Sequence, residues 1–152
     1  MRIGWVKSME IKKLKAVDAE ATFAIMKESF STTWSQQAIE SLINSQDAVC
    51  LGSFEGDVLQ GYAFLECVLD EGSLTDIAVS PDFRRRGISQ ALMEALLKEA
   101  EDRNLAFVTL EVRASNTPAI NLYRKNGFED VGVRPSYYTA PTEDALLMTK
   151  TF

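Results

Sequence analysis

The chain has 152 residues, 46% of them hydrophobic and 25% charged, which is the size and composition of one globular domain with its own core. Its formal net charge of −6 is opposite to that of most duplex-binding domains, so we expect no direct contact with nucleic acid. No apolar run approaches the ~18 residues that cross a membrane, and we expect a cytoplasmic protein without membrane contacts.

The side chains available for chemistry are restricted. The sequence has no histidine, so acid–base catalysis must use carboxylates, tyrosine, lysine or cysteine. Cys50 and Cys67 lie in apolar runs without the spacing of a metal site, which favours buried free thiols over a disulfide or a metal. The acidic balance suits a cationic substrate such as an amine, although many proteins are acidic only for solubility.

The first half of the chain predicts two helices followed by antiparallel strands. Residues 1–8 match no element, and we interpret them as an N-terminal extension, with Met9 as an alternative start. Apolar spacing and caps then predict a strand at 10–16, a helix at 19–30, a short helix after Ser35, a hairpin of strands 48–54 and 58–68, and a strand at 74–79. Trp34 lies between the two helices, where lining a substrate cleft and anchoring the core are equally good interpretations.

The segment TDIAVSPDFRRRGISQALMEA, residues 75–95, joins that strand to an amphipathic helix that continues to about residue 103. Three arginines and Gly87 stand at the helix start, although arginine opposes the helix dipole there. A bound anion would remove this conflict, because the free amides of a helix N-terminus attract phosphate and glycine lets the main chain approach closely. We therefore favour a pyrophosphate site over an ordinary connection with solvated arginines.

The second half predicts a strand at 106–113, a helix at 117–126 that Gly127 ends, and strands at 128–133 and 145–151. Antiparallel strands followed by a β-α-β-α-β-β order indicate an α/β fold with a mixed sheet. Glu111 is unexpected on a strand flanked by helices, and the pattern alone favours a solvated glutamate or a pair with Arg113. Tyr123 lies among apolar helix residues, and the pattern alone slightly favours a core tyrosine.

Three segments together resemble the GNAT superfamily of acetyl-coenzyme A-dependent N-acetyltransferases: LTDIAVSPDFRRRGISQALM, LEVRASNTPAINLYRKNGF and VGVRPSYYTAPTEDALLM. More narrowly, EVRASN…AI.LY…GF, R..YY and EDAL.M are similar to the ribosomal-protein alanine N-acetyltransferases. The resemblance runs from Met9 to about Lys150. It implies that residues 1–152 form a single GNAT domain, with a mixed, mostly antiparallel sheet of about seven strands that is splayed between the fourth and fifth strands and flanked by four helices.

The resemblance also implies roles for individual residues. The superfamily's R/Q-x-x-G-x-G/A loop falls on residues 84–89, where amides would hold the coenzyme pyrophosphate, while the main chain of 77–79 and the Asn116 side chain would hold the pantetheine arm. The full coenzyme-binding set is Ile77, Ala78, Val79, Arg85, Arg86, Gly87, Ile88, Ser89, Gln90 and Asn116. Ser89 departs from the pattern, in which Gly or Ala is usual.

The same resemblance implies that Glu111 is the general base and Tyr123 the general acid, and that Tyr138 contacts the acceptor. From its place in the chain Trp34 is a further candidate for contact with the acceptor, and we expect no metal site. A thiolate resembles free cysteine, with a pKa of ~8.5, against ~10 for tyrosine. Proton transfer from Tyr123 is then uphill by ~2 kcal/mol unless the environment of Tyr123 lowers its pKa. Pro135 lies just before the Tyr137-Tyr138 pair. The loop that would contact the peptide therefore matches the family pattern less closely than the other segments do.

The resulting hypothesis is an enzyme that uses acetyl-coenzyme A to acetylate the N-terminal alanine of a ribosomal small-subunit protein, by direct attack of the amine on the thioester. One alternative keeps the chemistry but takes a small amine, such as a polyamine, an aminoglycoside or an amino acid. Another is a coenzyme A-binding module without catalysis. We expect a monomer or weak dimer whose partner is the ribosomal protein or its N-terminal peptide.

Overall fold

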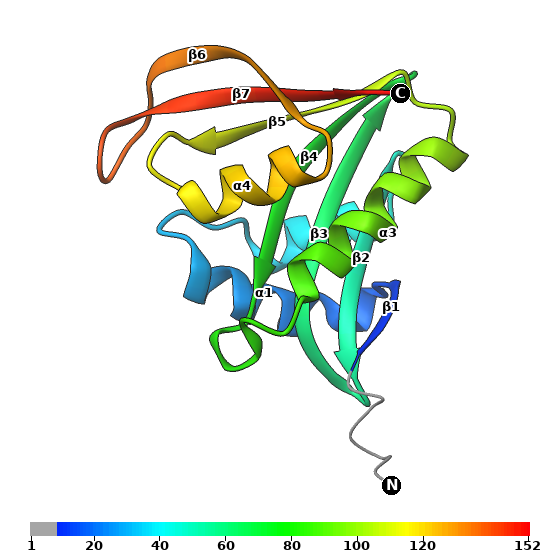
Figure 1. Cartoon of the computed structure of the whole chain (residues 1–152). Coiled ribbons are helices and arrows are strands. Elements are labelled where there is room, and N and C mark those ends of the chain that lie inside the picture. Colours follow the sequence, from blue (N-terminus) through cyan, green and yellow to red (C-terminus); the bar gives the residue numbers. More distant parts are fainter. Residues whose placement is uncertain (1–8) are drawn as a thin grey trace, which may run out of the picture.

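One seven-stranded sheet organises the computed structural model, which describes residues 9–152 (Figure 1). The spatial order of the strands is β1-β2-β3-β4-β5-β7-β6. The strands are β1 (Glu10–Lys13), β2 (Ala48–Glu55), β3 (Val58–Val68), β4 (Glu71–Val79), β5 (Phe107–Arg113), β6 (Glu129–Tyr138) and β7 (Glu143–Thr151). The helices are α1 (Ala19–Ser29), α2 (Gln36–Ile43), α3 (Ile88–Asp102) and α4 (Thr117–Lys125), with 3-10 turns η2 (Ala16–Asp18) and η3 (Pro81–Phe83). The expected extension at 1–8 lies outside the described residues.

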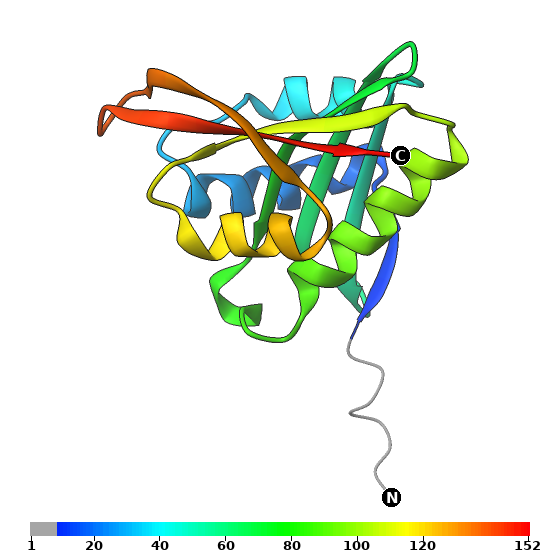
Figure 2. The same cartoon turned by 45° about the horizontal axis from the view of Figure 1, so that its top comes forward.

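Helices cover both faces of the sheet, and each face has its own hydrophobic core (Figures 1 and 2). On one face α3 and α4 bury residues such as Leu92, Leu96 and Ile120. On the other face α1 and α2 bury Met26 and Ile39. The i, i+4 spacing of Leu92 and Leu96 places both on the helix face that meets the sheet. Between residues 9 and 152 no helix is long and apolar enough to cross a membrane.

The sheet splits between its two central strands, as the resemblance implied. β4 and β5 run parallel and pair at three successive positions, from Glu71 opposite Phe107 to Ser73 opposite Thr109. Beyond that point each strand pairs only on its other side, β4 with β3 and β5 with β7. Residues 74–79 of β4 therefore present an open backbone edge. Unpaired strand edges accept added extended chains, which makes the split a natural place for an elongated ligand.

Most predicted element boundaries agree with the structure, and the differences have local causes. β1 ends at Lys13, before the end expected at 16, because the η2 turn begins at Ala16. β6 runs to Tyr138 rather than ending at 133, since Pro135 sits on an edge strand that pairs with β7 through register irregularities. Cys50 is buried as expected, but Cys67 is only half-buried, and both are free thiols.

Candidate active site

The turn before α3 has the backbone geometry of an anion site. Arg85 has a φ of +66° and Gly87 a φ of +78°, with Arg86 between them outside the positive-φ region. This alternation points successive amides to one side, as in other anion-binding turns. Gly87 is the N-cap of the fifteen-residue α3 and supplies no capping side chain, so the amides of the first turn stay available. A Cβ built on Gly87 meets no atom within 4 Å, so the space beside it is open.

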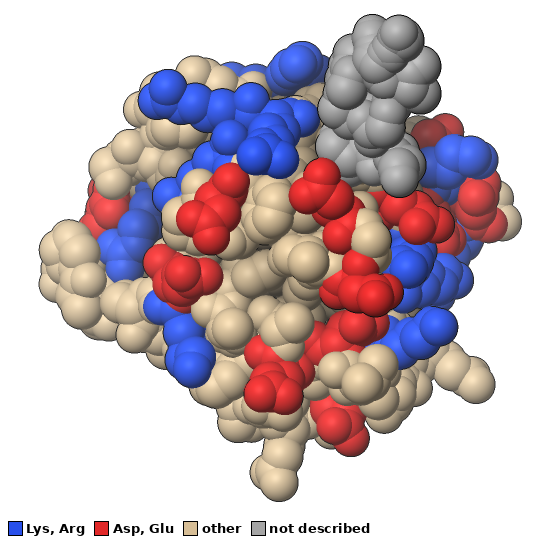
Figure 3. Space-filling view, turned by 90° about the horizontal axis from the view of Figure 1, so that it is seen from below, with Lys and Arg blue, Asp and Glu red and all other residues tan. Residues whose placement is uncertain are grey.

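The arginines around this turn have different surroundings. Arg84 Nε donates a hydrogen bond to the Val79 carbonyl at 3.3 Å, which ties the turn to the end of β4. The Arg86 guanidinium lies over the Phe83 ring, 5.2 Å from its centroid. Arg85 is exposed. Viewed from below, lysine and arginine side chains form a large group at the upper left and smaller groups at the lower left and right, with acidic side chains between them (Figure 3). The turn therefore combines exposed amides with local positive charge.

Two predicted coenzyme contacts are constrained by internal hydrogen bonds. The Gln90 side chain exchanges hydrogen bonds with the Asn126 amide at 2.9 Å, so Gln90 can serve a ligand only through its backbone N–H. Asn116 caps α4, because its Oδ1 accepts from the Ala119 amide at 3.3 Å. The Asn116 side-chain NH₂ group makes no hydrogen bond within residues 9–152, so it remains available as a donor.

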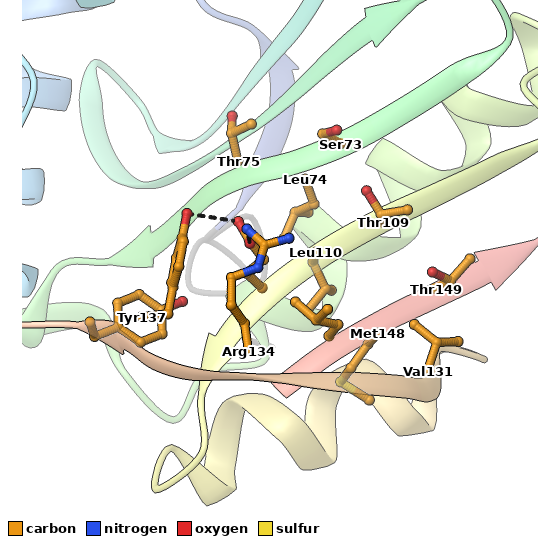
Figure 4. A pocket seen from close by; sticks show the side chains of 13 residues that line it. Ser73, Leu74, Thr75, Thr109, Leu110, Val131, Arg134, Tyr137, Met148 and Thr149 are labelled. Carbon is orange, nitrogen blue, oxygen red and sulfur yellow. Dashed lines mark hydrogen bonds and ion pairs between the residues drawn. The ribbon is translucent and has the colours of Figure 1, made fainter. Parts of the chain in front are cut away.

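A cavity of about 630 Å³ opens on the sheet face opposite α3 and α4 (Figure 4). Side chains alternate between the two faces along β5. Val108, Leu110 and Val112 join the core under α3 and α4, so Glu111 lies on the opposite face, where the cavity is. β4, β5, β6 and β7 all contribute to its wall. The lining residues are Ser73, Leu74, Thr75, Thr109, Leu110, Glu111, Val131, Arg134, Tyr137, Tyr138, Leu147, Met148 and Thr149.

Glu111 lies at this cavity in a defined hydrogen-bonding frame. Arg134 forms an ion pair with its Oε2 at 2.9 Å, and the Tyr137 hydroxyl donates to its Oε1 at 3.2 Å. Figure 4 shows Arg134 and Tyr137 reaching from β6 toward β5. The Glu111 side chain is 35% exposed, so water can reach the carboxylate. The exposure of Glu111 agrees with the first alternative from the sequence pattern, a solvated glutamate. The second alternative, a pair with Arg113, is wrong, because Glu111 pairs with Arg134 and Arg113 with Glu143.

Arg113 is instead committed to the β6–β7 connection. Its guanidinium donates to the carbonyls of Thr139 at 2.8 Å and Pro141 at 2.9 Å, and pairs with Glu143 at 3.3 Å. It also lies 4.6 Å from the centroid of the Tyr138 ring. Arg113 thus fixes both the connection and Tyr138, which lines the cavity. Burial, followed by the nearby Glu111 charge, raises the pKa of Tyr138 to about 12, so its hydroxyl stays protonated.

Tyr123 approaches the split strands from the opposite face. It is 5% exposed in α4, with its ring 5.9 Å from that of Phe128. Burial first, then the charges of Asp76 and Tyr138, raise the pKa of Tyr123 above its ordinary value. The lowered pKa that would ease proton donation is therefore absent, and the phenol stays protonated at neutral pH. Within residues 9–152 its hydroxyl has no hydrogen-bond partner, which is unusual for a buried phenol and leaves it available to a ligand.

Trp34 packs against the hydrophobic core and is not among the residues that line the cavity. Its ring packs 5.6 Å from that of Phe64, its amide approaches the Met26 sulfur at 3.4 Å, and it joins the core under α1 and α2. The structure thus brings Glu111 and Tyr138 together at the cavity, whereas Tyr123 belongs to the core under α3 and α4 and Trp34 packs against the core under α1 and α2. It adds one acidic residue that the sequence analysis did not single out: Asp76, within the strand segment LTDIAV.

Comparisons with known proteins agree with this architecture. Residues 19–128 match the sequence profile described as the Acetyltransferase (GNAT) family. The chain is 36% identical to a ribosomal protein bS18-alanine N-acetyltransferase of Escherichia coli strain K12, over 91% of this chain and 94% of that protein. A crystal structure of the E. coli ribosomal-protein-S18-alanine N-acetyltransferase superposes with a TM-score of 0.87 at 34% identity, covering 94% of this chain and 93% of that one. Arabidopsis thaliana NAA60, in complex with acetyl-CoA, shares the fold with a TM-score of 0.87 at 20% identity, covering 95% of this chain and 98% of its own.

Proposed function

The chain belongs to the GNAT family of acetyltransferases, and we propose that it uses acetyl-coenzyme A to acetylate the N-terminal alanine of the small-subunit ribosomal protein bS18. The observation that carries the choice of acceptor is the 36% identity, over 91% of the chain, to the E. coli enzyme of that name. On this proposal the chain acts as a single domain in the cytoplasm, where ribosomal proteins are made.

The coenzyme would lie along the open edge of β4. Its diphosphate would accept hydrogen bonds from the amides of the turn and first helical residues at 85–90, with Arg85 and Arg86 adding positive charge. Its pantetheine arm would pair with the main chain of 77–79 and with the Asn116 side chain. The left-handed turn and the unpaired strand edge support this placement, since both supply backbone groups that the fold leaves unused.

The acceptor amine would enter through the cavity and attack the thioester carbonyl directly. A protein α-amine has a pKa of ~8, so near neutral pH only about one pH unit separates the ammonium ion from the nucleophilic amine. Glu111 would accept a proton at the cavity wall through a water molecule, because its carboxylate is exposed and held by Arg134 and Tyr137. Tyr123, on the other side of the split, would protonate the departing sulfur.

A peptide panel tests the acceptor. We expect acetylation, measured as a 42-dalton gain that maps to the N-terminus, on a peptide with the bS18 N-terminal sequence, and no acetylation of spermidine or of the same peptide with a blocked N-terminus. Intact masses of ribosomal proteins from cells that lack this protein should show bS18 alone lighter by one acetyl group. Equal turnover of spermidine, or an unchanged bS18 mass, would contradict the proposed acceptor.

Replacing Glu111 with glutamine is expected to lower kcat by about 100-fold while the acetyl-coenzyme A affinity stays within ~3-fold of wild type. Glutamine keeps the size of the side chain but cannot accept a proton. The effect lies at the low end for acid–base residues because water also reaches this position. Steady-state kinetics with saturating peptide measures it, and Glu129→Gln, an exposed glutamate on β6, is the matched control. Wild-type turnover in Glu111→Gln would remove Glu111 from the reaction.

Replacing Arg113 with methionine is expected to raise the KM for the peptide by roughly 10-fold and to change kcat much less. The variant loses two charge-assisted hydrogen bonds, to the Thr139 and Pro141 carbonyls, so the β6–β7 connection loses its anchor. Peptide titrations at saturating acetyl-coenzyme A measure the effect. A KM equal to that of wild type would show that this connection does not shape the acceptor site.

A further inference from the structure

Asp76 is aimed at the α1–α2 face of the sheet by a bulge in β4. Leu74 pairs with Leu65 and Asp76 with Phe64, so Thr75 is an extra residue in the β4 register. Leu74 accordingly belongs to the core under α3, whereas Ala78, which shares a face with Asp76, belongs to the core under α1 and α2. Bulges often redirect side chains next to active sites. Here the bulge places a carboxyl group beside Thr75, which lines the cavity (Figure 4).

The Asp76 side chain is half-buried, and no ion pair joins it to a lysine or arginine of residues 9–152. The hydroxyl of Tyr62, a residue that is 0% exposed, donates to Asp76 Oδ2 at 3.0 Å. The Ile77 amide also donates to the carboxylate. Buried carboxylates are usually paired with cations. A positively charged nitrogen from outside the chain would complete this environment.

Asp76 also lies close enough to Tyr123 for the two groups to influence each other. After burial, the Asp76 charge is the next largest cause of the raised pKa of Tyr123. Asp76 belongs to the part of β4 that lies beyond the last pair with β5, while Tyr123 is a buried residue of α4 in the core under that helix. A carboxylate on the acceptor side and a phenol on the coenzyme side therefore flank the place proposed for the thioester. Glu111 differs, because Arg134 already neutralises it.

We propose that Asp76 is a catalytic residue that takes a proton from the acceptor nitrogen as that nitrogen attacks the thioester carbonyl, with Tyr62 holding the carboxylate in position. This inference rests on the acetyl transfer proposed above. The ammonium ion first loses one proton to water at Glu111. The N–C bond then forms and the C–S bond breaks, the second nitrogen proton passes to Asp76, and Tyr123 protonates the sulfur. Return of the Asp76 proton to the Tyr123 oxygen restores both groups.

The surroundings of Asp76 suit this role. Burial raises its pKa to about 6, although the hydrogen bonds from Tyr62 and the Ile77 amide lower it. Tyr62 from β3 hydrogen-bonds to it, and the Asp76 charge, like that of Tyr138 from β6, raises the pKa of Tyr123 in α4. The charged residues of α1 are exposed and form no ion pair with it, and Glu111 on β5 pairs with Arg134. Asp76 is thus ionised at neutral pH and more basic than an ordinary carboxylate.

The pH dependence of kcat tests the role, with saturating peptide and acetyl-coenzyme A. Ionisation of the acceptor amine, with a pKa of ~8, lowers kcat below neutral pH in every variant. In wild type we expect an additional acidic limb, a steeper fall of kcat as the pH drops through about 6, because protonated Asp76 accepts nothing. Asp76→Asn should lower kcat by about 100-fold at pH 7.5 and lose this acidic limb. Tyr62→Phe should move the limb to higher pH, since the lost hydrogen bond favoured the ionised form. Asp57→Asn, in the exposed β2–β3 turn, should behave as wild type.

Unfolding gives a readout that does not depend on turnover. An ordinary aspartate has a pKa of 3.8 and folded Asp76 one of about 6, so the folded state binds more protons in that window and wild type loses stability as the pH rises through it. The unfolding constant of wild type relative to Asp76→Asn should therefore rise about 10-fold between pH 5 and 7.5. A constant ratio, or an Asp76→Asn enzyme that keeps its kcat and its acidic limb, would overturn the inference. A wild type that acetylates no N-terminal peptide would instead overturn the proposed function.

Discussion

Replacing Gly87 with aspartate is expected to weaken acetyl-coenzyme A binding by about 1,000-fold. Gly87 has a φ of +78°, and a non-glycine residue there is strained by ~1–2 kcal/mol. A carboxylate ~4 Å from one diphosphate charge would add a repulsion of ~4 kcal/mol at an effective dielectric constant of 20, which salt at this exposed turn reduces. A net loss of ~4 kcal/mol corresponds to the stated 1,000-fold change in Kd.

Two variants separate the causes of that loss. Gly87→Ala adds the backbone strain without the charge, and because its Cβ meets no protein atom within 4 Å, we expect Kd to rise only about 5- to 30-fold. Gly56→Asp puts the same charge on a turn of similar geometry, φ +61°, also in open space, and should leave Kd unchanged. Calorimetric titration with coenzyme A measures all three. Unchanged affinity in Gly87→Asp would place the diphosphate away from this turn.

Replacing Tyr123 with phenylalanine is expected to lower kcat by about 100- to 10,000-fold with little change in coenzyme affinity. The ring packing against Phe128 is kept and only the hydroxyl is lost. Because the hydroxyl has no hydrogen-bond partner among residues 9–152, the variant should be at least as stable as wild type. A slow enzyme with normal folding and normal affinity would then assign the loss to the chemical step.

The matched control for Tyr123 is Tyr137→Phe. Tyr137 donates one hydrogen bond to Glu111 on the cavity side, so its loss should cost less than 10-fold in kcat. Both variants are measured by single-turnover kinetics with acetyl-coenzyme A in saturating amount. Wild-type turnover in Tyr123→Phe would show that the departing sulfur takes its proton from water or from another group, and would withdraw the acid role from Tyr123.

Local sequence patterns predicted the helices whose first residues are recognisable capping residues. Ser35 accepts a hydrogen bond from the Ala38 amide at 3.1 Å and begins α2 as expected, and Asn116 begins α4 in the same way. The connection between β4 and α3 was also predicted, because Pro81 and Gly87 mark its turn and the helix start. Its role as an anion site stays a prediction. The strand split came from the family resemblance and is confirmed by the short β4–β5 pairing.

Contacts between distant segments could not be predicted in this way. Glu111 meets Arg134 rather than Arg113 because the β6–β7 connection and Glu143 occupy Arg113, a competition that strand alternation does not show. Asp76 is the one acidic residue in the mostly apolar strand segment LTDIAV. That contrast was the feature of the sequence that could have identified Asp76 as a candidate site residue. Its direction depends on the one-residue bulge at Thr75, and its partner Tyr62 is fixed only by the β3–β4 register.

The proposed reaction depends on the α3 turn, which would fix a diphosphate and thereby set the thioester between carboxylates and Tyr123. A crystal structure of the protein with an unreactive acetyl-coenzyme A analogue tests it most directly. We predict the diphosphate on the amides of residues 85–90, and the sulfur within ~3.5 Å of the Tyr123 hydroxyl, at hydrogen-bonding reach for sulfur. A diphosphate bound away from the start of α3, or a sulfur turned away from Tyr123, would contradict the account.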